Sequence, residues 1–328
     1  MSNSPSNTPH ENPTTPTKWS PSQTPQIPMP AQQIVNSEIT ALELFDLFLG
    51  SDNLMEHVKW HEEGRVERLV LKSGNEDSEE EEPSEEAILQ IIRKISADEA
   101  FWMDPNGGWT GKFGDLQQSK ASCQVVTPAP LQLNHWQKVL DTVSRLMQDH
   151  RTKQAEIWNS LITQSQGLRI RHSVFDAVDY DTYKACTEAL AKKDKGLLMA
   201  NWACGTTKAQ NELNSLIWHN NEDNHRTTHY FGNLIPIFYH DRTRLLPNNP
   251  QYSEKLRGAV VKVGISITHE FMSGKSVNDF YADIRYIIIL KKPPTPSKAP
   301  LKRSVDFPDL TASGRPSEAS SSSKRARA

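Results

Sequence analysis

The alternation of apolar and polar residues is clearest near the C-terminal end of the chain. From Ala259 to Phe271 the odd-numbered positions are mostly aliphatic, and the even-numbered positions include Lys262, Ser266 and Thr268. After a short polar stretch, the even-numbered positions from Phe280 to Leu290 are all apolar or aromatic. A period of two residues is typical of a half-buried strand. The two segments therefore predict a long antiparallel hairpin.

The rest of the chain carries mostly the three- and four-residue spacing of helices. Apolar residues in heptad register run over 131–162, with polar residues near His150, which predicts one interrupted helix or two helices that meet there. A homodimeric coiled coil and an intramolecular bundle face both fit this series. Further helices are predicted at 42–49, 87–95, 179–190 and 207–217, and short strands at 65–71 and 168–174.

These elements predict an α+β protein with a mostly helical N-terminal and central part and a C-terminal antiparallel β-hairpin. A single core is expected over 34–290. The acidic stretch 74–86 holds eight acidic residues and no basic one, so it is predicted to be a solvated loop inside that core. A docking strip for a basic partner is the alternative for the same stretch.

Composition shows why the core is smaller than the chain. Only 36% of the 328 residues are hydrophobic and 21 are prolines, and the apolar deficit lies mainly in two terminal segments. Residues 1–33 are rich in Pro, Ser and Thr, and 291–328 are rich in Ser, Pro and basic residues. Segments of this kind bury too little apolar surface to offset the entropy lost on ordering. Both are predicted to be disordered tails.

Each tail suggests a function. The N-terminal tail repeats the Ser/Thr-Pro dipeptide, which predicts a substrate for proline-directed kinases. The C-terminal tail has nine basic and three acidic residues and ends in a cluster made of Lys324, Arg325 and Arg327. Such a cluster predicts a signal that a nuclear import receptor binds. The alternative is a cytoplasmic protein whose basic tail binds no import receptor.

Several classes of protein are disfavoured. No window approaches the apolar length of a membrane-spanning helix, so no membrane partner is expected. The three cysteines have no CxxC spacing, which argues against a disulfide framework and favours a reducing compartment. Neither a phosphate-binding loop nor a serine-nucleophile motif is present. These absences favour a non-enzymatic protein, for which no cofactor is expected.

One segment holds enough ligating residues for a metal-dependent alternative. His219, Glu222, His225 and His229 lie within eleven positions, and a helix would place His225 and His229 on one face. Two imidazoles and a carboxylate could hold a divalent metal and leave a position for water, as in a hydrolase or nuclease. The neighbouring asparagines instead indicate an exposed polar loop.

Basic residues interleaved with aromatic ones predict a surface for nucleic acid. The candidates are Arg242, Arg244, Lys262, Tyr281 and Arg285, because aromatic rings on a sheet stack bases while cations meet phosphates. An ordinary amphipathic strand surface would show the same pattern. The balance of 37 Lys+Arg against 40 Asp+Glu argues against tight electrostatic binding by the core alone.

The leading hypothesis is a nuclear, non-enzymatic interaction protein that associates with nucleic acid, with protein partners or with both. It would carry a phosphorylatable N-terminal tail and a C-terminal import signal. The alternatives are a metal-dependent hydrolase or nuclease that uses the His219–His229 cluster, and a structural protein that self-associates through 131–162 as a homodimer.

Overall fold

The structure is a computed structural model, which describes residues 30–72, 85–97, 101–112, 114–127, 133–153, 155–222, 228–247, 249 and 252–294. The described residues up to Pro293 belong to one compact unit. Most of both predicted tails and most of the acidic stretch lie outside these ranges, so their predicted disorder is untested. The first helix begins at Ala31, inside the segment assigned to the N-terminal tail.

The predicted fold class is wrong, because the described part of the chain is organised around a nine-stranded mixed sheet. The predicted C-terminal hairpin is present, but as the two longest strands of that sheet rather than as an appendage to helices. The strands of the sheet are β1 (Val58–Glu63), β2 (Val66–Leu71), β3 (Leu89–Ile95), β4 (Lys120–Val126), β5 (Glu156–Asn159), β6 (Leu168–Ser173), β9 (Ile237–Tyr239), β10 (Val260–Met272) and β11 (Val277–Lys291).

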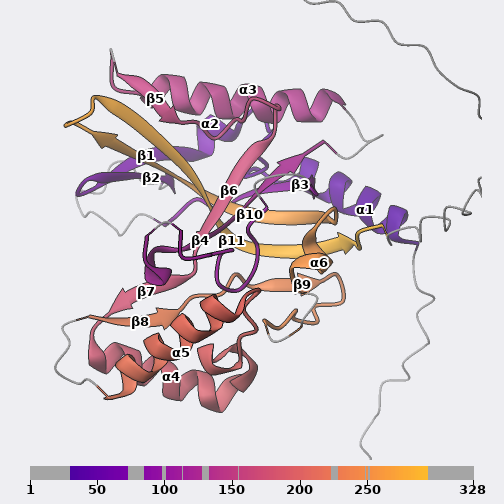
Figure 1. Ribbon diagram of the computed structural model, residues 1–328. Coiled ribbons are helices and arrows are strands. Elements are labelled where there is room, and N and C mark those ends of the chain that lie inside the picture. Colours follow the sequence, from indigo (N-terminus) through magenta and orange to yellow (C-terminus); the bar gives the residue numbers. More distant parts are fainter. Residues whose placement is uncertain are drawn as a thin grey trace, which may run out of the picture. The chain divides into compact units, whose positions relative to one another are not determined.

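The helices and a second, two-stranded sheet surround this large sheet (Figure 1). The second sheet pairs β7 (Phe175–Val178) with β8 (His229–Gly232). The helices are α1 (Ala31–Glu43), α2 (Leu54–His57), α3 (Leu133–His150), α4 (Tyr180–Lys193), α5 (Thr207–Glu222) and α6 (Tyr252–Leu256), with single turns η1 (Leu116–Gln118), η2 (Lys195–Leu197) and η3 (Met199–Asn201). Within the described ranges, none of the helices is long and apolar enough to cross a membrane.

The segment 87–95, predicted as a helix, forms the strand β3. Its apolar residues fit a helical spacing only because both faces of the strand are covered. Leu89 and Ile91 are buried on one face, and Ile92 is buried on the other. A strand buried on both sides loses its period of two and cannot be distinguished from a helix by spacing. The isoleucines, which are β-branched, favour the strand.

The segment 131–162 is neither one helix nor two. The helix α3 ends at His150, and Glu156–Asn159 forms β5, which pairs in parallel with β11. This pairing joins residues about 120 positions apart, so no local pattern could reveal it. The apolar stripe of α3 is buried within the same chain, including Trp136, Val143 and Leu146. It is therefore not exposed for a homodimeric coiled coil.

The helix predicted at 42–49 is also wrong, because α1 ends at Glu43 and a turn follows. Other predictions are confirmed. The strands predicted at 65–71 and 168–174 are β2 and β6, and the helix predicted from Asp179 is α4. The carboxylate of Asp179 caps that helix by accepting a hydrogen bond from the backbone N–H of Thr182. The helix predicted at 207–217 is α5.

Five strands of the large sheet close into a ring. β3 pairs with β4, β4 with β6, β6 with β11, β11 with β10, and β10 with β3. All these pairs are antiparallel except β6 with β11. Alternate residues point into the ring and form its core, among them Leu89, Ile91, Cys123, Val125, Leu168, Ile170, Val263, Ile265 and Ile284. The ring is thus a small barrel filled with apolar side chains.

Side chains reinforce the parallel seam of this barrel, where only Asp283 and Arg171 are paired in register. On the inner face, His172 contacts the carbonyl oxygens of Ile284 and Asn233 at 3.0 and 2.8 Å. Burial lowers the pKa of His172, although the two carbonyl contacts act in the opposite direction. On the outer face, Arg171 Nε donates to Asp283 Oδ1 at 3.1 Å.

The hairpin β10–β11 extends beyond the barrel. There β2 pairs with β10 at 268–270, and β5 pairs with β11 at 277–279. The helix α3 lies along this extension, above β5 and α2 in Figure 1, while α4, α5, β7 and β8 gather on the other side of the molecule. The helix α1 packs against β3 and β11 at the opposite end of the hairpin.

Candidate functional site

The outer face of the barrel carries a row of polar and aromatic residues that runs across four strands. Ser122 on β4 is paired with Arg171 on β6, Arg171 with Asp283 on β11, and Asp283 with Ser266 on β10. Trp102 extends the row, because its backbone forms a β-bridge with Ser122. Side chains of residues paired in this way lie side by side on one face of a sheet. We call this surface the outer barrel face.

A basic and aromatic cluster occupies the centre of the outer barrel face. The guanidinium of Arg171 lies 3.2 Å from the centroid of the Tyr281 ring, and Lys120 Nζ lies 5.7 Å from the same ring. Burial and the charge of Arg171 lower the pKa of Lys120. Burial raises the pKa of Tyr281, and its hydroxyl donates to Asp279 Oδ2 at 3.0 Å. The tyrosine is therefore a neutral donor at pH 7.

Trp102 stands at the edge of this cluster with 47% of its surface exposed. The loop that precedes β4 shapes its surroundings. Gly108 has φ +65° and lies so close to the indole that a Cβ at this position would overlap Trp102 Cε3. Only glycine adopts this backbone conformation without strain while leaving room for the ring. An exposed indole positioned by its loop is a surface on which a planar group can stack.

Carboxylates balance much of the positive charge. Glu86, the last residue of the acidic stretch, pairs with Arg285 and lies 3.6 Å from Arg68 Nη1. Arg68 also pairs with Glu63 at 2.6 Å. Arg285 Nε donates to Ser266 Oγ at 2.9 Å, which holds the guanidinium on the outer barrel face. The face therefore offers fixed cations, several of which already have acidic partners.

The five residues predicted to bind nucleic acid fall into separate places. Tyr281 and Arg285 lie on the outer barrel face, as described above. Lys262 lies toward the α1 end of β10, where its Nζ is 3.2 Å from Glu38 Oε2. Arg242 occupies a turn after β9 with φ +69°, and the guanidinium of Arg244 lies 5.9 Å from the Phe238 ring. The structure thus brings two of the five together and leaves the others apart.

The sequence analysis did not identify four residues of the outer barrel face as binding residues. They are Trp102, Lys120, Arg169 and Arg171. Arg169 and Arg171 occupy the polar positions of a strand that was predicted. That alternation could have identified them as a basic strand face. Trp102 and Lys120 had no such signal, because only the pairing of β4 with its neighbours places them beside Arg171.

The predicted metal cluster is only partly within the described residues. His219 lies near the end of α5, 4.8 Å from the Trp218 ring. His229 is buried on β8 between the rings of Tyr180 and Tyr183. The side chain of Glu222 and all of His225 lie outside the described residues. A metal site that includes them therefore stays a prediction.

Another set of ligating side chains converges at the hairpin extension. Glu67, His150 and His269 place their ligating atoms within 4.8 Å of one another, and they are the one such set found among the described residues. Burial on its own would raise the pKa of Glu67. The contacts with His269 and His150 outweigh burial and hold that pKa below its usual value.

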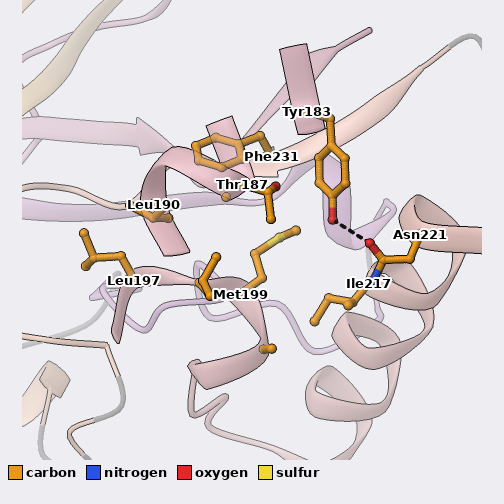
Figure 2. Close-up of a pocket in the computed structure, with 11 residues that line it drawn as sticks. Tyr183, Thr187, Leu190, Leu197, Met199, Ile217, Asn221 and Phe231 are labelled. Atoms are coloured by element: carbon orange, nitrogen blue, oxygen red, sulfur yellow. Dashed lines mark hydrogen bonds between the residues drawn. The ribbon is translucent and has the colours of Figure 1, made fainter. Parts of the chain in front are cut away.

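A small apolar cavity lies in the region formed by α4, α5 and β8. Its volume is about 130 Å³, and Figure 2 shows Leu190, Leu197 and Met199 along one side. Tyr183 and Asn221 supply polar atoms at its other side, where the tyrosine hydroxyl donates to Asn221 Oδ1 at 3.4 Å. This volume is below the usual range of small-molecule pockets, about 300–1,000 Å³.

Comparisons with known proteins identify no family. No family model matches the sequence, and no curated protein matches it. Among solved structures, the single-stranded DNA-binding protein from bacteriophage Enc34 is similar over 76% of this chain and 97% of that chain, with 9% identity and a TM-score of 0.29. Its complex with single-stranded DNA covers 74% of this chain and 99% of that chain, with 11% identity and the same TM-score. At these values the likeness does not establish a common fold.

Proposed function

We propose that this protein binds single-stranded nucleic acid on the outer barrel face. The observation that supports the proposal most directly is the arrangement of exposed Trp102 in one cross-strand row with Arg171, whose guanidinium covers the Tyr281 ring. Base stacking on aromatic side chains and phosphate contacts from nearby cations are the two features that single-stranded nucleic-acid sites combine.

The topology of the barrel supports the same proposal by analogy. Counted along the chain, its strands are β3, β4, β6, β10 and β11, and the ring joins them in the order first, second, third, fifth, fourth. This is the strand order of the five-stranded Greek-key barrel whose second and third strands bind oligonucleotides. In this chain the second and third strands are β4 and β6, which carry Lys120, Arg169 and Arg171. A fold by itself assigns no function, so the side chains carry the argument.

Single strands fit this surface better than a duplex. A stacking platform needs bases with an open face, and the bases of a duplex are stacked on each other. The acidic partners Asp283 and Glu86 keep the surface close to neutral. We therefore expect moderate affinity and a shallow dependence on salt, because few phosphates can be neutralised at once.

The test compares two exposed tryptophans in the full-length protein. Trp102 lies on the outer barrel face. Trp218 lies on α5, outside that face, and is 59% exposed. We expect Trp102→Ala to weaken binding of a labelled oligothymidine about 5- to 150-fold, the equivalent of one lost stacking contact of about 1–3 kcal/mol. Trp218→Ala should leave the dissociation constant unchanged. Fluorescence anisotropy over a salt series measures both.

Two outcomes would contradict the proposal. One is wild-type protein that binds neither single-stranded DNA nor single-stranded RNA at low salt. The other is binding that Trp102→Ala and Trp218→Ala reduce equally, which would place the nucleic acid elsewhere. An unlabelled duplex used as a competitor distinguishes stacking from general phosphate attraction, because a duplex should compete poorly with the single strand.

The nuclear location and the phosphorylation of the N-terminal tail remain proposals from the sequence. Lys324, Arg325 and Arg327 lie outside the described residues, and the Ser/Thr-Pro dipeptides do as well. Removal of 324–328 from a fluorescently tagged chain should shift the protein from the nucleus to the cytoplasm. A deletion variant that stays as nuclear as the full chain would refute the import signal.

A further inference from the structure

We infer that Glu67, His150 and His269 form a binding site for one divalent transition-metal ion of the zinc class. Glu67 Oε2 lies 2.5 Å from His269 Nδ1 and 2.7 Å from His150 Nε2. The three residues come from β2, the C-terminal end of α3 and β10. Along β10, His269 alternates with Thr268, which is on the same side of the strand as Ser266 of the outer barrel face. The site therefore lies on the opposite face of the hairpin and is independent of the proposed nucleic-acid surface.

The hydrogen bonds of Asn278 determine which nitrogen of His269 carries a proton. Asn278 Oδ1 accepts the backbone N–H of Thr152 at 3.1 Å, which requires an oxygen at that position. The same oxygen lies 2.8 Å from His269 Nε2. An oxygen can only accept, so Nε2 carries the proton and donates it. In the neutral imidazole, Nδ1 then presents a lone pair toward Glu67.

A lone pair and a carboxylate oxygen repel each other at 2.5 Å unless a positive charge lies between them. A proton can supply that charge by converting His269 to imidazolium, and a metal ion can supply it as well. His150 favours the metal ion. Its Nε2 is buried and within 2.7 Å of Glu67 Oε2, yet it has no partner with hydrogen-bond geometry among the described residues. A metal ion would bind both ring nitrogens and the carboxylate together.

The surrounding residues hold both rings in place, as in metal sites whose ligands are oriented from behind. The ring of His150 stacks on Trp60 with centroids 4.5 Å apart and planes within 9°. The ring of His269 stacks on Phe280, also at 4.5 Å. Asn278 is fully buried and accepts the Nε2 proton of His269, which orients Nδ1 toward the metal position. The two imidazole rings are therefore already oriented, so little side-chain entropy would be lost when they bind a metal ion.

Ligand chemistry and geometry restrict the ion. Two imidazole nitrogens with one carboxylate suit zinc, cobalt, nickel, copper and iron rather than magnesium or calcium, which prefer oxygen ligands. In a tetrahedral site with bonds of about 2.1 Å, ligand atoms are about 3.4 Å apart. The three groups would have to separate by about 1 Å, which the partly exposed side chains of Glu67 and His150 allow. Three protein ligands leave a fourth position for water.

The experiment measures metal binding directly in the untagged full-length protein. The protein is treated with EDTA, dialysed and titrated with Co²⁺, whose visible absorption reports tetrahedral nitrogen and oxygen ligands. We expect one equivalent of Co²⁺ to bind, Zn²⁺ to displace it, and Mg²⁺ in excess to leave the spectrum unchanged. Zn²⁺ should also raise the midpoint of thermal unfolding, because an ion that binds only the folded state stabilises it.

Variants locate the ion. Glu67→Gln and His150→Gln should each weaken Co²⁺ binding at least about tenfold, the effect expected even for loss of an outer partner of a metal ligand. His57→Gln is the matched control, because His57 is partly exposed on α2, where it lies 3.9 Å from Asp46. Far-ultraviolet circular dichroism in EDTA shows whether each variant is folded. A variant that fails to fold is replaced by Asn278→Ala, which removes the orienting acceptor of His269 and should also weaken binding.

Two results would overturn the inference. If the wild-type protein takes up no Co²⁺ or Zn²⁺, the network is a proton-bridged ion pair of His269 and Glu67. If folded Glu67→Gln and His150→Gln bind the ion as tightly as the wild type and His57→Gln do, the ion is bound elsewhere in the chain. Neither result would affect the nucleic-acid proposal, which is tested by different variants and a different ligand.

Discussion

The two ends of the outer surface of β10 and β11 have similar residues but different surroundings. At one end, Lys262 and Tyr286 are covered by α1, and Glu38 of that helix pairs with Lys262 at 3.2 Å. At the other end, Arg171 and Tyr281 lie on the outer barrel face with no helix assigned over them in the described residues. Both ends carry at least one cation and one tyrosine.

The difference shows that cover, rather than residue type, decides which end can bind a ligand. Burial raises the pKa of Tyr286 and also that of Tyr281, so both rings stay neutral at pH 7. What differs is that Lys262 is paired with a carboxylate of α1, whereas Arg169 is exposed on the outer barrel face. A cation with a helix above it cannot reach a phosphate.

The largest expected effect on stability comes from disrupting the packing of α1 over the covered end. Val35 on α1 is 1% exposed, so Val35→Asp would bury a charge without a partner. We expect the free energy of unfolding to fall by more than about 3 kcal/mol, because an unpaired buried charge is among the most destabilising changes. Urea denaturation measures the loss. Asn36→Asp, one residue along on the exposed side of α1, should change stability by less than about 0.5 kcal/mol. Equal effects would show that α1 is not packed as described.

A smaller loss of stability is expected from adding a methyl group at the end of the hairpin that α1 covers. A Cβ on Gly264 would overlap the ring of Tyr286, which lies across this position of β10. Gly264→Ala should therefore destabilise the protein by about 1–3 kcal/mol, the usual cost of forcing extra atoms into a packed region. Gly274, in the hairpin turn, has no neighbour within 4 Å of an added Cβ. Thermal denaturation of Gly264→Ala against Gly274→Ala makes the comparison, and a harmless Gly264→Ala would mean that Tyr286 moves freely.

The smallest effect concerns the carboxylates that neutralise each end. Glu86→Gln removes the acidic partner shared by Arg285 and Arg68 on the outer barrel face. We expect a 3- to 10-fold gain in affinity for the labelled oligothymidine, about 1 kcal/mol, and a steeper dependence on salt as freed cations meet phosphates. Stability should change little, because partly exposed ion pairs contribute about 0–1 kcal/mol.

Glu38→Gln is the matched control for Glu86→Gln. It frees Lys262 beneath α1, so the affinity for the oligonucleotide should stay within about twofold of the wild type. If both substitutions raise the affinity equally, the covered end is as accessible as the open end. The contrast between the two ends would then have no functional meaning.

Local patterns predicted elements well where one face of a segment is exposed. The strand β6 alternates because one side meets solvent, β10 alternates in residue type although most of it is buried, and α4 and α5 carry capping residues at their starts. Prediction failed for β3, which is buried on both faces, and for β5, which exists only because its backbone pairs with β11. A sequence pattern reveals an element only where buried and exposed positions differ in residue type, and neither β3 nor β5 shows such a difference.

The candidate sites divide in the same way. Tyr281 and Arg285 could be identified from the polar positions of the terminal hairpin. Trp102, from a loop far from β11 in sequence, joins them only through pairing with β4. The ligands Glu67, His150 and His269 are separated by 202 positions between the first and the last, so no motif spacing could have suggested them. Side chains that meet only through the pairing of distant strands produce no periodic pattern in the sequence.

The sequence by itself determined the long terminal hairpin, the capped helices, and the segregation of charge into an acidic stretch and a basic tail, because these depend on neighbouring residues. The tertiary structure decided that the chain is built on a mixed sheet with a closed barrel rather than on helices. It also decided which cations are covered and which histidines face a carboxylate. These properties depend on hydrogen bonds between strands far apart in the chain, whose free energy is gained only when the barrel closes.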